Sequence, residues 1–139
     1  MRRASVTIPA FLLLVGLSTA CGSDPTAPAA ANNALAFVGM WQNIDAQTNS
    51  IPQIAISMQG NQVLVHVWGA CLPTYCDWGQ AAAQLANGAL SVTWQFGFQV
   101  DTQMLTTSGG QLHSALHVHF TDGSGRPDYD SADVFNKVS

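Results

Sequence analysis

The regular alternation of apolar and polar residues is the feature that most restricts how this chain can fold. Between residues 90 and 99 every second side chain is apolar, namely Leu90, Val92, Trp94, Phe96 and Phe98. Residues 62–69 and 111–121 show the same period. Successive side chains of a β-strand point to opposite faces of a sheet, so this period predicts strands that bury one face. The chain also lacks Glu and is rich in Val, Thr and Gln, which favours strands over helices.

Turn-forming residues divide the chain into eight expected strands, at 37–45, 51–58, 62–69, 77–86, 90–99, 100–107, 111–121 and 129–138. The pairs Gly60-Asn61 and Asn87-Gly88 are typical of tight hairpin turns. Residues 80–86 leave a helix open as an alternative, because alanine is the best helix former. Short strands in this order predict an all-β fold, a small antiparallel up-and-down barrel, because closure covers the edges of the sheet. A β-sandwich is the alternative.

The N-terminus resembles a bacterial lipoprotein signal peptide over residues 1–20. Arg2 and Arg3 precede an apolar run at residues 10–17, which is shorter than the roughly 20 residues that span a bilayer, and small residues then lead to Cys21. The resemblance implies cleavage before Cys21, a lipid such as palmitate on its thiol, and attachment to the cell envelope. Gly22 rather than Asp follows the cysteine, so we expect the outer membrane where the host has one.

The remaining chain reads as a tether followed by one domain. Residues 21–34 are rich in Ala, Pro, Ser, Thr and Asn, which predicts a flexible linker. Residues 35–139 are enough for a single barrel domain. After Cys21 the chain keeps Arg126 and Lys137 against eight Asp, a net charge of 2 − 8 = −6, which argues against a nucleic-acid partner.

Two further cysteines, Cys71 and Cys76, are expected to form a disulfide in the oxidising compartment outside the inner membrane. Their spacing differs from the C-x-x-C of redox-active pairs, so we expect a structural bond.

Three segments carry a resemblance to known proteins. They are 39–43 (GMWQN), 67–79 (VWGACLPTYCDWG) and 120–129 (FTDGSGRPDY). Together they resemble a group of small secreted or lipid-anchored bacterial proteins without an assigned function. The opening Gly-x-Trp and the expected meander are also similar to lipocalin-type and avidin-type barrels. The second and third segments imply structural roles for four residues, Asp77, Gly79, Arg126 and Asp128.

Three histidines, His113, His117 and His119, are expected on one face of the strand at 111–121. Imidazoles two residues apart project in parallel, so they could bind zinc or copper. The alternative is a solvated outer face of the barrel, where polar residues alternate with core residues. Four aspartates follow nearby, and these suggest either a calcium loop or an ion pair with Arg126, namely Asp122, Asp128, Asp130 and Asp133.

The aromatic residues Trp41, Trp68, Trp78 and Tyr75 form the last candidate site. Aromatic rings in a barrel mouth could hold an apolar or carbohydrate-like ligand, whereas the alternative is that they fill the core. The sequence shows no motif of a catalytic nucleophile, a phosphate-binding loop or a zinc protease, so we predict no catalytic residue and no cofactor.

These features predict a non-catalytic, lipid-anchored binding module for a small ligand or an envelope protein. One alternative is a structural or inhibitory surface protein that acts through its exterior. The other is a metal-binding protein or an enzyme that uses the three histidines.

Overall fold

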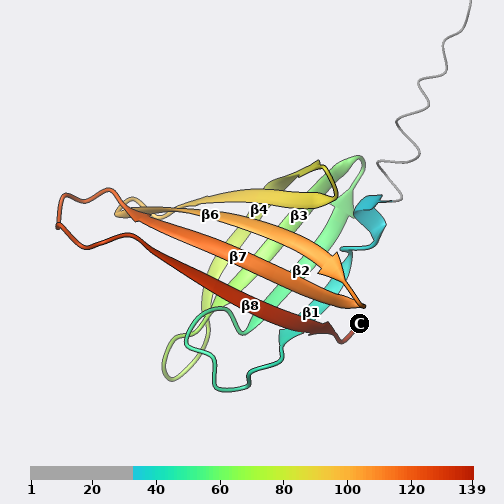
Figure 1. Ribbon diagram of the computed structural model, residues 1–139, viewed down its shortest axis with the longest axis horizontal. Coiled ribbons are helices and arrows are strands. Elements are labelled where there is room, and N and C mark those ends of the chain that lie inside the picture. The colour runs from blue at the N-terminus through green and yellow to red at the C-terminus, as the bar shows by residue number, and fades with distance from the viewer. Residues whose placement is uncertain (1–32) are drawn as a thin grey trace, which may run out of the picture.

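The computed structural model describes residues 33–139, which form a closed barrel of eight antiparallel strands (Figure 1). Each strand pairs with its neighbours in chain order, and the last strand pairs with the first. The strands are β1 (Gly39–Asn43), β2 (Gln53–Gln59), β3 (Gln62–Gly69), β4 (Cys76–Ala86), β5 (Ala89–Gln95), β6 (Gln99–Ser108), β7 (Gln111–Phe120) and β8 (Tyr129–Lys137). The predicted all-β barrel is therefore confirmed, and the pairing of β1 with β8 excludes the β-sandwich.

β1 and β5 are shorter than the strands expected at 37–45 and 90–99, and residues 80–86 decide between the expected strand and its helical alternative. β5 ends at Gln95, and the chain reverses through Phe96, Gly97 (φ 80°) and Phe98 before β6 begins. The apolar alternation runs on through this reversal, so the period does not mark where the strand ends. Residues 80–86 are strand rather than helix, because β4 pairs with β3 and turns small alanine side chains against the core. This pairing outweighs the helix preference of alanine.

The expected signal peptide at 1–20, Cys21 and most of the expected linker at 21–34 lie outside the described residues. Residues 33–35 form one helical turn, and Ala34 is buried against the barrel instead of belonging to a tether. In the described part of the chain, no helix has the length and apolar character needed to cross a membrane.

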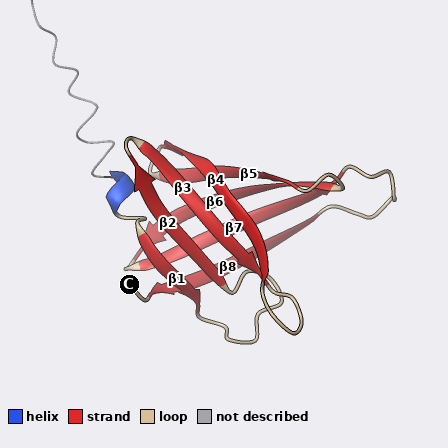
Figure 2. Ribbon diagram, turned by 180° about the vertical axis from the view of Figure 1, so that it is seen from behind, coloured by secondary structure: helices blue, strands red, loops and turns tan. Residues whose placement is uncertain are grey.

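The two ends of the barrel differ (Figures 1 and 2). One end, which we call the closed end, carries the helical turn, the C-terminus and the short turns at 60–61, 87–88 and 109–110. The opposite end, which we call the mouth, carries the other connections, at 44–52, 70–75, 96–98 and 121–128. In Figure 2 the long loops extend away from the helix.

Side chains fill the closed half of the barrel. The largest fully buried ones include Phe37, Trp41, Ile54, Leu105 and Phe135. A buried polar layer lies above them, where Trp94 Nε1 donates to Gln103 Oε1 (3.1 Å) and Gln103 Nε2 donates to Ser114 Oγ (2.9 Å). Asp101 is two residues nearer the mouth than Gln103 on the same inner face of β6. Buried polar groups therefore continue along the inner face of β6 from the core towards the mouth.

Candidate binding site at the barrel mouth

A cavity of about 630 Å³ opens at the mouth, within the range of roughly 300–1,000 Å³ that is typical of small-ligand sites. Its walls come from the β1–β2 and β3–β4 connections and from the inner faces of β6 and β8. Polar and aromatic groups that line it include Ser50, Trp78, Gln99, Asp101, Ser131 and Asp133. Ligand-binding cavities usually combine a small number of convergent polar groups with aromatic side chains.

Asp101 places a carboxylate in the wall of this cavity, and the residue is 0% exposed. Gln99, two residues earlier on the same face, donates from Nε2 to both carboxylate oxygens at 2.9 Å. Burial raises the pKa of Asp101 above its ordinary value of 3.8, while the Gln99 hydrogen bond and the nearby His117 act in the opposite direction. A buried carboxyl group of raised pKa in a cavity wall is a frequent mark of a functional site.

A second carboxylate, that of Asp133, fixes the β1–β2 connection. Asn43 Nδ2 donates to Asp133 Oδ1 (2.8 Å), Ser50 Oγ donates to Asp133 Oδ2 (2.8 Å), and Thr48 Oγ1 lies 3.4 Å from Oδ1. Asn43 Nδ2 also donates to the carbonyl oxygen of Ile51 (2.8 Å). These bonds hold the loop against the inner wall, so this side of the mouth is shaped before any ligand arrives.

The predicted disulfide between Cys71 and Cys76 is confirmed, with 5.5 Å between the Cα atoms. It closes the β3–β4 connection, and Trp78 follows it along the cavity wall. Gly69 on the facing strand leaves room for this ring, because a Cβ atom there would lie 2.5 Å from Trp78 Nε1. The position of the indole therefore depends on the missing side chain at residue 69.

A smaller cleft of about 280 Å³ shares Trp78, Gln99 and Cys76 with the mouth cavity. Asp77, Phe96 and Phe98 complete its lining, and the rings of Trp78 and Phe96 meet edge to face at 5.3 Å. The side chain of Gln99 thus borders an acidic, polar space and an aromatic one.

The four aromatic candidates from the sequence do not share one site. Trp78 alone among them lines the mouth cavity. Trp41 is buried, and its Nε1 donates to the carbonyl oxygen of Phe37 (2.7 Å) near the closed end. Trp68 lies on the outer face of β3, and Tyr75 is half-exposed on the β3–β4 connection beside the mouth.

The predicted structural residues Asp77 and Gly79 belong to an outer cluster. Trp68 stacks on His66 with the ring centroids 4.0 Å apart, and His66 Nε2 lies 2.6 Å from Asp77 Oδ1. The same oxygen accepts the backbone N–H of Gly79 (2.7 Å), and these two hydrogen bonds lower the pKa of Asp77. Gly79 has φ 81° at the register shift between β3 and β4, a conformation that glycine adopts without strain.

The three histidines of β7 lie on the outer face, where His117 and His119 both approach Asp128 but His113 lies apart from them. His117 Nδ1 lies 2.8 Å from Asp130 Oδ1, and His119 Nδ1 lies 2.7 Å from Asp128 Oδ2. His113 is four residues from His117, about 13 Å along the strand. Among residues 33–139, no three His, Cys, Asp or Glu side chains form a group that could hold a metal ion.

Arg126 holds the β7–β8 connection together. Its Nη2 lies 2.6 Å from Asp122 Oδ2, and its guanidinium carbon lies 3.9 Å from the centroid of the Phe120 ring. Hydrogen bonds from Ser124, together with Arg126, lower the pKa of Asp122 to about 2. Asp128 accepts the backbone N–H of Phe120 at 3.2 Å. The loop is therefore held by contacts among its own residues and the end of β7.

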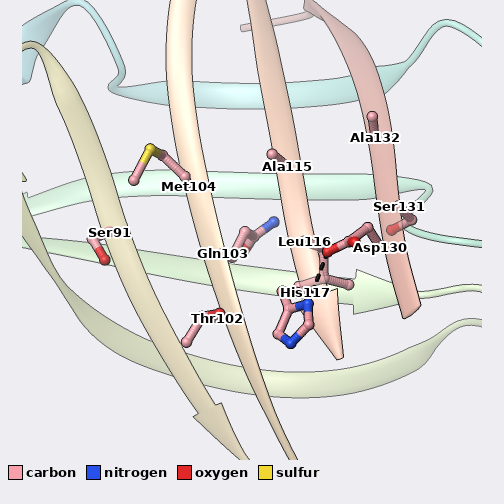
Figure 3. A pocket seen from close by; sticks show the side chains of 10 residues that line it. All are labelled: Ser91, Thr102, Gln103, Met104, Ala115, Leu116, His117, Asp130, Ser131 and Ala132. Carbon is pink, nitrogen blue, oxygen red and sulfur yellow. Dashed lines mark hydrogen bonds and ion pairs between the residues drawn. The ribbon is translucent and has the colours of Figure 1, made fainter. Parts of the chain in front are cut away.

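An open hollow of about 470 Å³ lies on the outside of the barrel across β5–β8 (Figure 3). Met104, Ala115 and Ala132 present apolar surface there. His117 and Asp130 form the ion pair drawn at its edge, so they already satisfy each other. The mouth cavity is larger and adds a buried carboxylate and an aromatic ring, so it is the better candidate for binding a ligand.

Several cavity residues did not figure among the sequence candidates, above all Gln99, Asp101 and Ser131. The period of β6 could have found Asp101, because Leu105 is a core residue and positions 103 and 101 share its face. Nothing in the sequence links that strand to Trp78 on β4 or to Ser131 on β8.

Comparison with models of known protein families, with curated proteins and with solved structures gave no match to this chain. The resemblance to small lipid-anchored proteins and to lipocalin-type and avidin-type barrels therefore stays a prediction. Function has to be inferred from the chemistry of the mouth.

Proposed function

We propose that this protein is a non-catalytic binding module of the bacterial envelope that takes a small ligand into its mouth cavity. The observation that carries the proposal is a cavity of about 630 Å³ whose lining combines the indole of Trp78 with the polar groups of Gln99, Asp101 and Ser131. Lipid on Cys21 and, in a host with two membranes, location at the outer membrane belong to the same proposal.

The frame around the cavity supports this function. The barrel is closed, and side chains fill the half at its closed end. At the mouth, the Cys71–Cys76 disulfide holds the β3–β4 connection, and the hydrogen bonds to Asp133 hold the β1–β2 connection. A site that is already ordered loses less conformational entropy on binding, so more of the contact energy is retained as affinity.

The direction of the mouth also suits a tethered receptor. The described chain begins at the closed end, opposite the long loops. A flexible linker of eleven residues, as expected between Cys21 and residue 33, has a root-mean-square length of about 20 Å. A protein anchored through Cys21 would therefore have its closed end nearer the membrane and its mouth facing away from it.

A binding screen on the purified mature protein tests the proposal. The probes are methyl glucoside for carbohydrates, 2-phenylethanol for neutral apolar compounds and 2-phenylethylamine for cations. We expect at least one probe to shift the indole N–H resonance of Trp78 in an NMR titration. The outward-facing Trp68 is the internal reference, and its resonance should stay in place.

Matched variants separate the two faces of the barrel. Trp78→Phe should weaken binding of the active probe, and Trp68→Phe should leave it unchanged. If no probe moves the Trp78 resonance, the small-ligand function is wrong. If resonances of the outer face move instead, the exterior is the working surface.

A further inference from the structure

Asp101 is a negative charge without a cationic side chain beside it in the described part of the chain. The Arg and Lys side chains of residues 33–139 are Arg126 and Lys137. Arg126 pairs with Asp122, and the ammonium of Lys137 lies 5.5 Å from the ring of Trp41 near the closed end. A buried carboxylate without an opposite charge is costly, so a cation that reached this site would be bound favourably.

The other titratable groups around Asp101 do not supply a charge that pairs directly with its carboxylate, although His117 partly offsets the effect of burial on its pKa. Asp133 and Tyr129 on β8 and Asp45 on the β1–β2 connection line the same cavity, so two further carboxylates border it. His117 on β7 points to the outer face, where it pairs with Asp130. The mouth therefore concentrates negative charge in a partly dry space, where electrostatic attraction is stronger than in water.

Gln99 occupies the place that a cation would take. Its Nε2 lies 2.9 Å from Oδ1 and 2.9 Å from Oδ2 of Asp101, midway between the two acceptors. A carboxylate can accept about four hydrogen bonds, and the amide offers two hydrogens from one neutral nitrogen. The Gln99 side chain is only partly buried and borders both cavities, so it can turn away from Asp101 without repacking the core.

The adjoining cleft supplies surface for the rest of such a ligand. Trp78 and Phe96 line it within reach of Gln99. Aromatic rings next to a carboxylate are a recurrent arrangement for binding ammonium groups, because the ring faces attract cations and bury apolar carbon.

We propose that the mouth binds a small primary amine with a compact apolar body. The protonated amine replaces Gln99 Nε2 between the carboxylate oxygens of Asp101, and the body lies against Trp78 and Phe96. This inference rests on the proposed function, and it names the chemical class of the ligand.

The test compares 2-phenylethylamine with 2-phenylethanol, which has the same carbon skeleton but no charge, in calorimetric titrations of the mature protein at pH 7. We expect the amine to bind about tenfold or more tightly, the ratio that a charge-assisted hydrogen bond provides over a neutral one. Asp101→Asn should abolish this preference. Gln99→Ala should tighten amine binding, because it removes the group that competes for the carboxylate.

The outcomes are distinguishable. Equal binding of amine and alcohol, unchanged in Asp101→Asn, would overturn the amine inference and leave a small-ligand site standing. Weaker amine binding in Gln99→Ala would also overturn it, since Gln99 would then be a ligand contact. No binding of either probe by the native protein, together with no response to methyl glucoside, would remove the proposed function as well. Thermal melting of each variant confirms that the barrel is folded.

Discussion

At the scale of single residues, the molecule keeps a carboxylate where water does not reach it. Asp101 is fully buried and hydrogen-bonded by Gln99, and burial raises its pKa above 3.8. Such a group lowers the stability of the folded protein when it is ionised. Proteins tolerate this cost mainly at functional sites, where removal of the charge raises stability and reduces activity.

The first prediction follows from the direction of that pKa shift. The folded protein binds the Asp101 proton more tightly than the unfolded chain does, so the unfavourable contribution is complete above the folded pKa and absent below about 3.8. Asp101→Asn should therefore raise the free energy of unfolding at pH 7, and the gain should shrink as pH falls towards 3.8. Urea denaturation of both proteins across this range measures it.

A matched control for this prediction is Asp130→Asn, because the Asp130 side chain is 82% exposed in its pair with His117. It should change stability by less than about 1 kcal/mol, as is usual for surface pairs. A loss of stability in Asp101→Asn at pH 7 would mean that the ionised carboxylate is stabilised by its surroundings.

A second prediction concerns Gly69, whose missing side chain makes room for Trp78. A Cβ atom at residue 69 would lie 2.5 Å from Trp78 Nε1, so Gly69→Ala has to displace the indole. We expect an altered Trp78 NMR resonance and weaker binding of any mouth ligand. The control is Ala70→Gly, which alters a neighbouring residue without adding an atom. Gly88→Ala is unsuitable as a control, because φ is 75° at residue 88 and alanine would strain the backbone there. An unchanged Trp78 resonance in Gly69→Ala would contradict the expected displacement.

At the scale of elements, the strand limits show what periodicity can and cannot predict. Residues 62–69 were expected as a strand, and they form β3 over the same span. The Gly60-Asn61 turn marks the start of this strand, and the alternation of apolar and polar residues runs along its length. β5 is shorter than expected, since Phe96 and Phe98 continue the apolar alternation into the reversal. The glycine at residue 97 was the sequence signal for that turn, and its φ is 80° in the structure.

The third prediction concerns the β3–β4 connection. The disulfide joins residues five positions apart, and closure of so short a loop restricts the unfolded chain by about 2 kcal/mol. The double variant Cys71→Ala/Cys76→Ala should lose about that much stability in chemical denaturation. Amide hydrogen exchange should accelerate around residues 70–79, whereas the β6–β7 hairpin at the opposite end should keep its protection. Equal acceleration in both places would show that the bond stabilises the whole barrel and not this connection.

At the scale of the whole molecule, the candidate site exists only because the sheet closes. Trp78 comes from β4, Asp101 from β6 and Asp133 from β8, and the ring of strands brings them to one cavity. The sequence predicts which side chains face inwards on each strand, but it does not give the stagger between distant strands. For this reason the barrel could be predicted, while the acidic mouth could not.

The fourth prediction tests the orientation in the membrane. Single fluorophores on Asn61→Cys at the closed end and on Ala46→Cys at the mouth report distance from the bilayer, since both positions are exposed. In vesicles that contain spin-labelled lipid, the label at residue 61 should be quenched more strongly than the label at residue 46. The same proteins carrying Cys21→Ser should leave the vesicle fraction. The reverse order of quenching would place the mouth at the membrane.

The pairing of β1 with β8 also determines when this protein can complete its fold. Trp41 and Lys137 are partners in the sheet, so the ring cannot close until β8 is available to pair with β1. Contacts between such remote positions form slowly, because the intervening chain must first lose much of its freedom. Until that moment β1 and β8 each expose an unpaired edge, which other chains could join. The interval before β8 pairs with β1 is therefore the period in which this polypeptide is most vulnerable to aggregation and proteolysis.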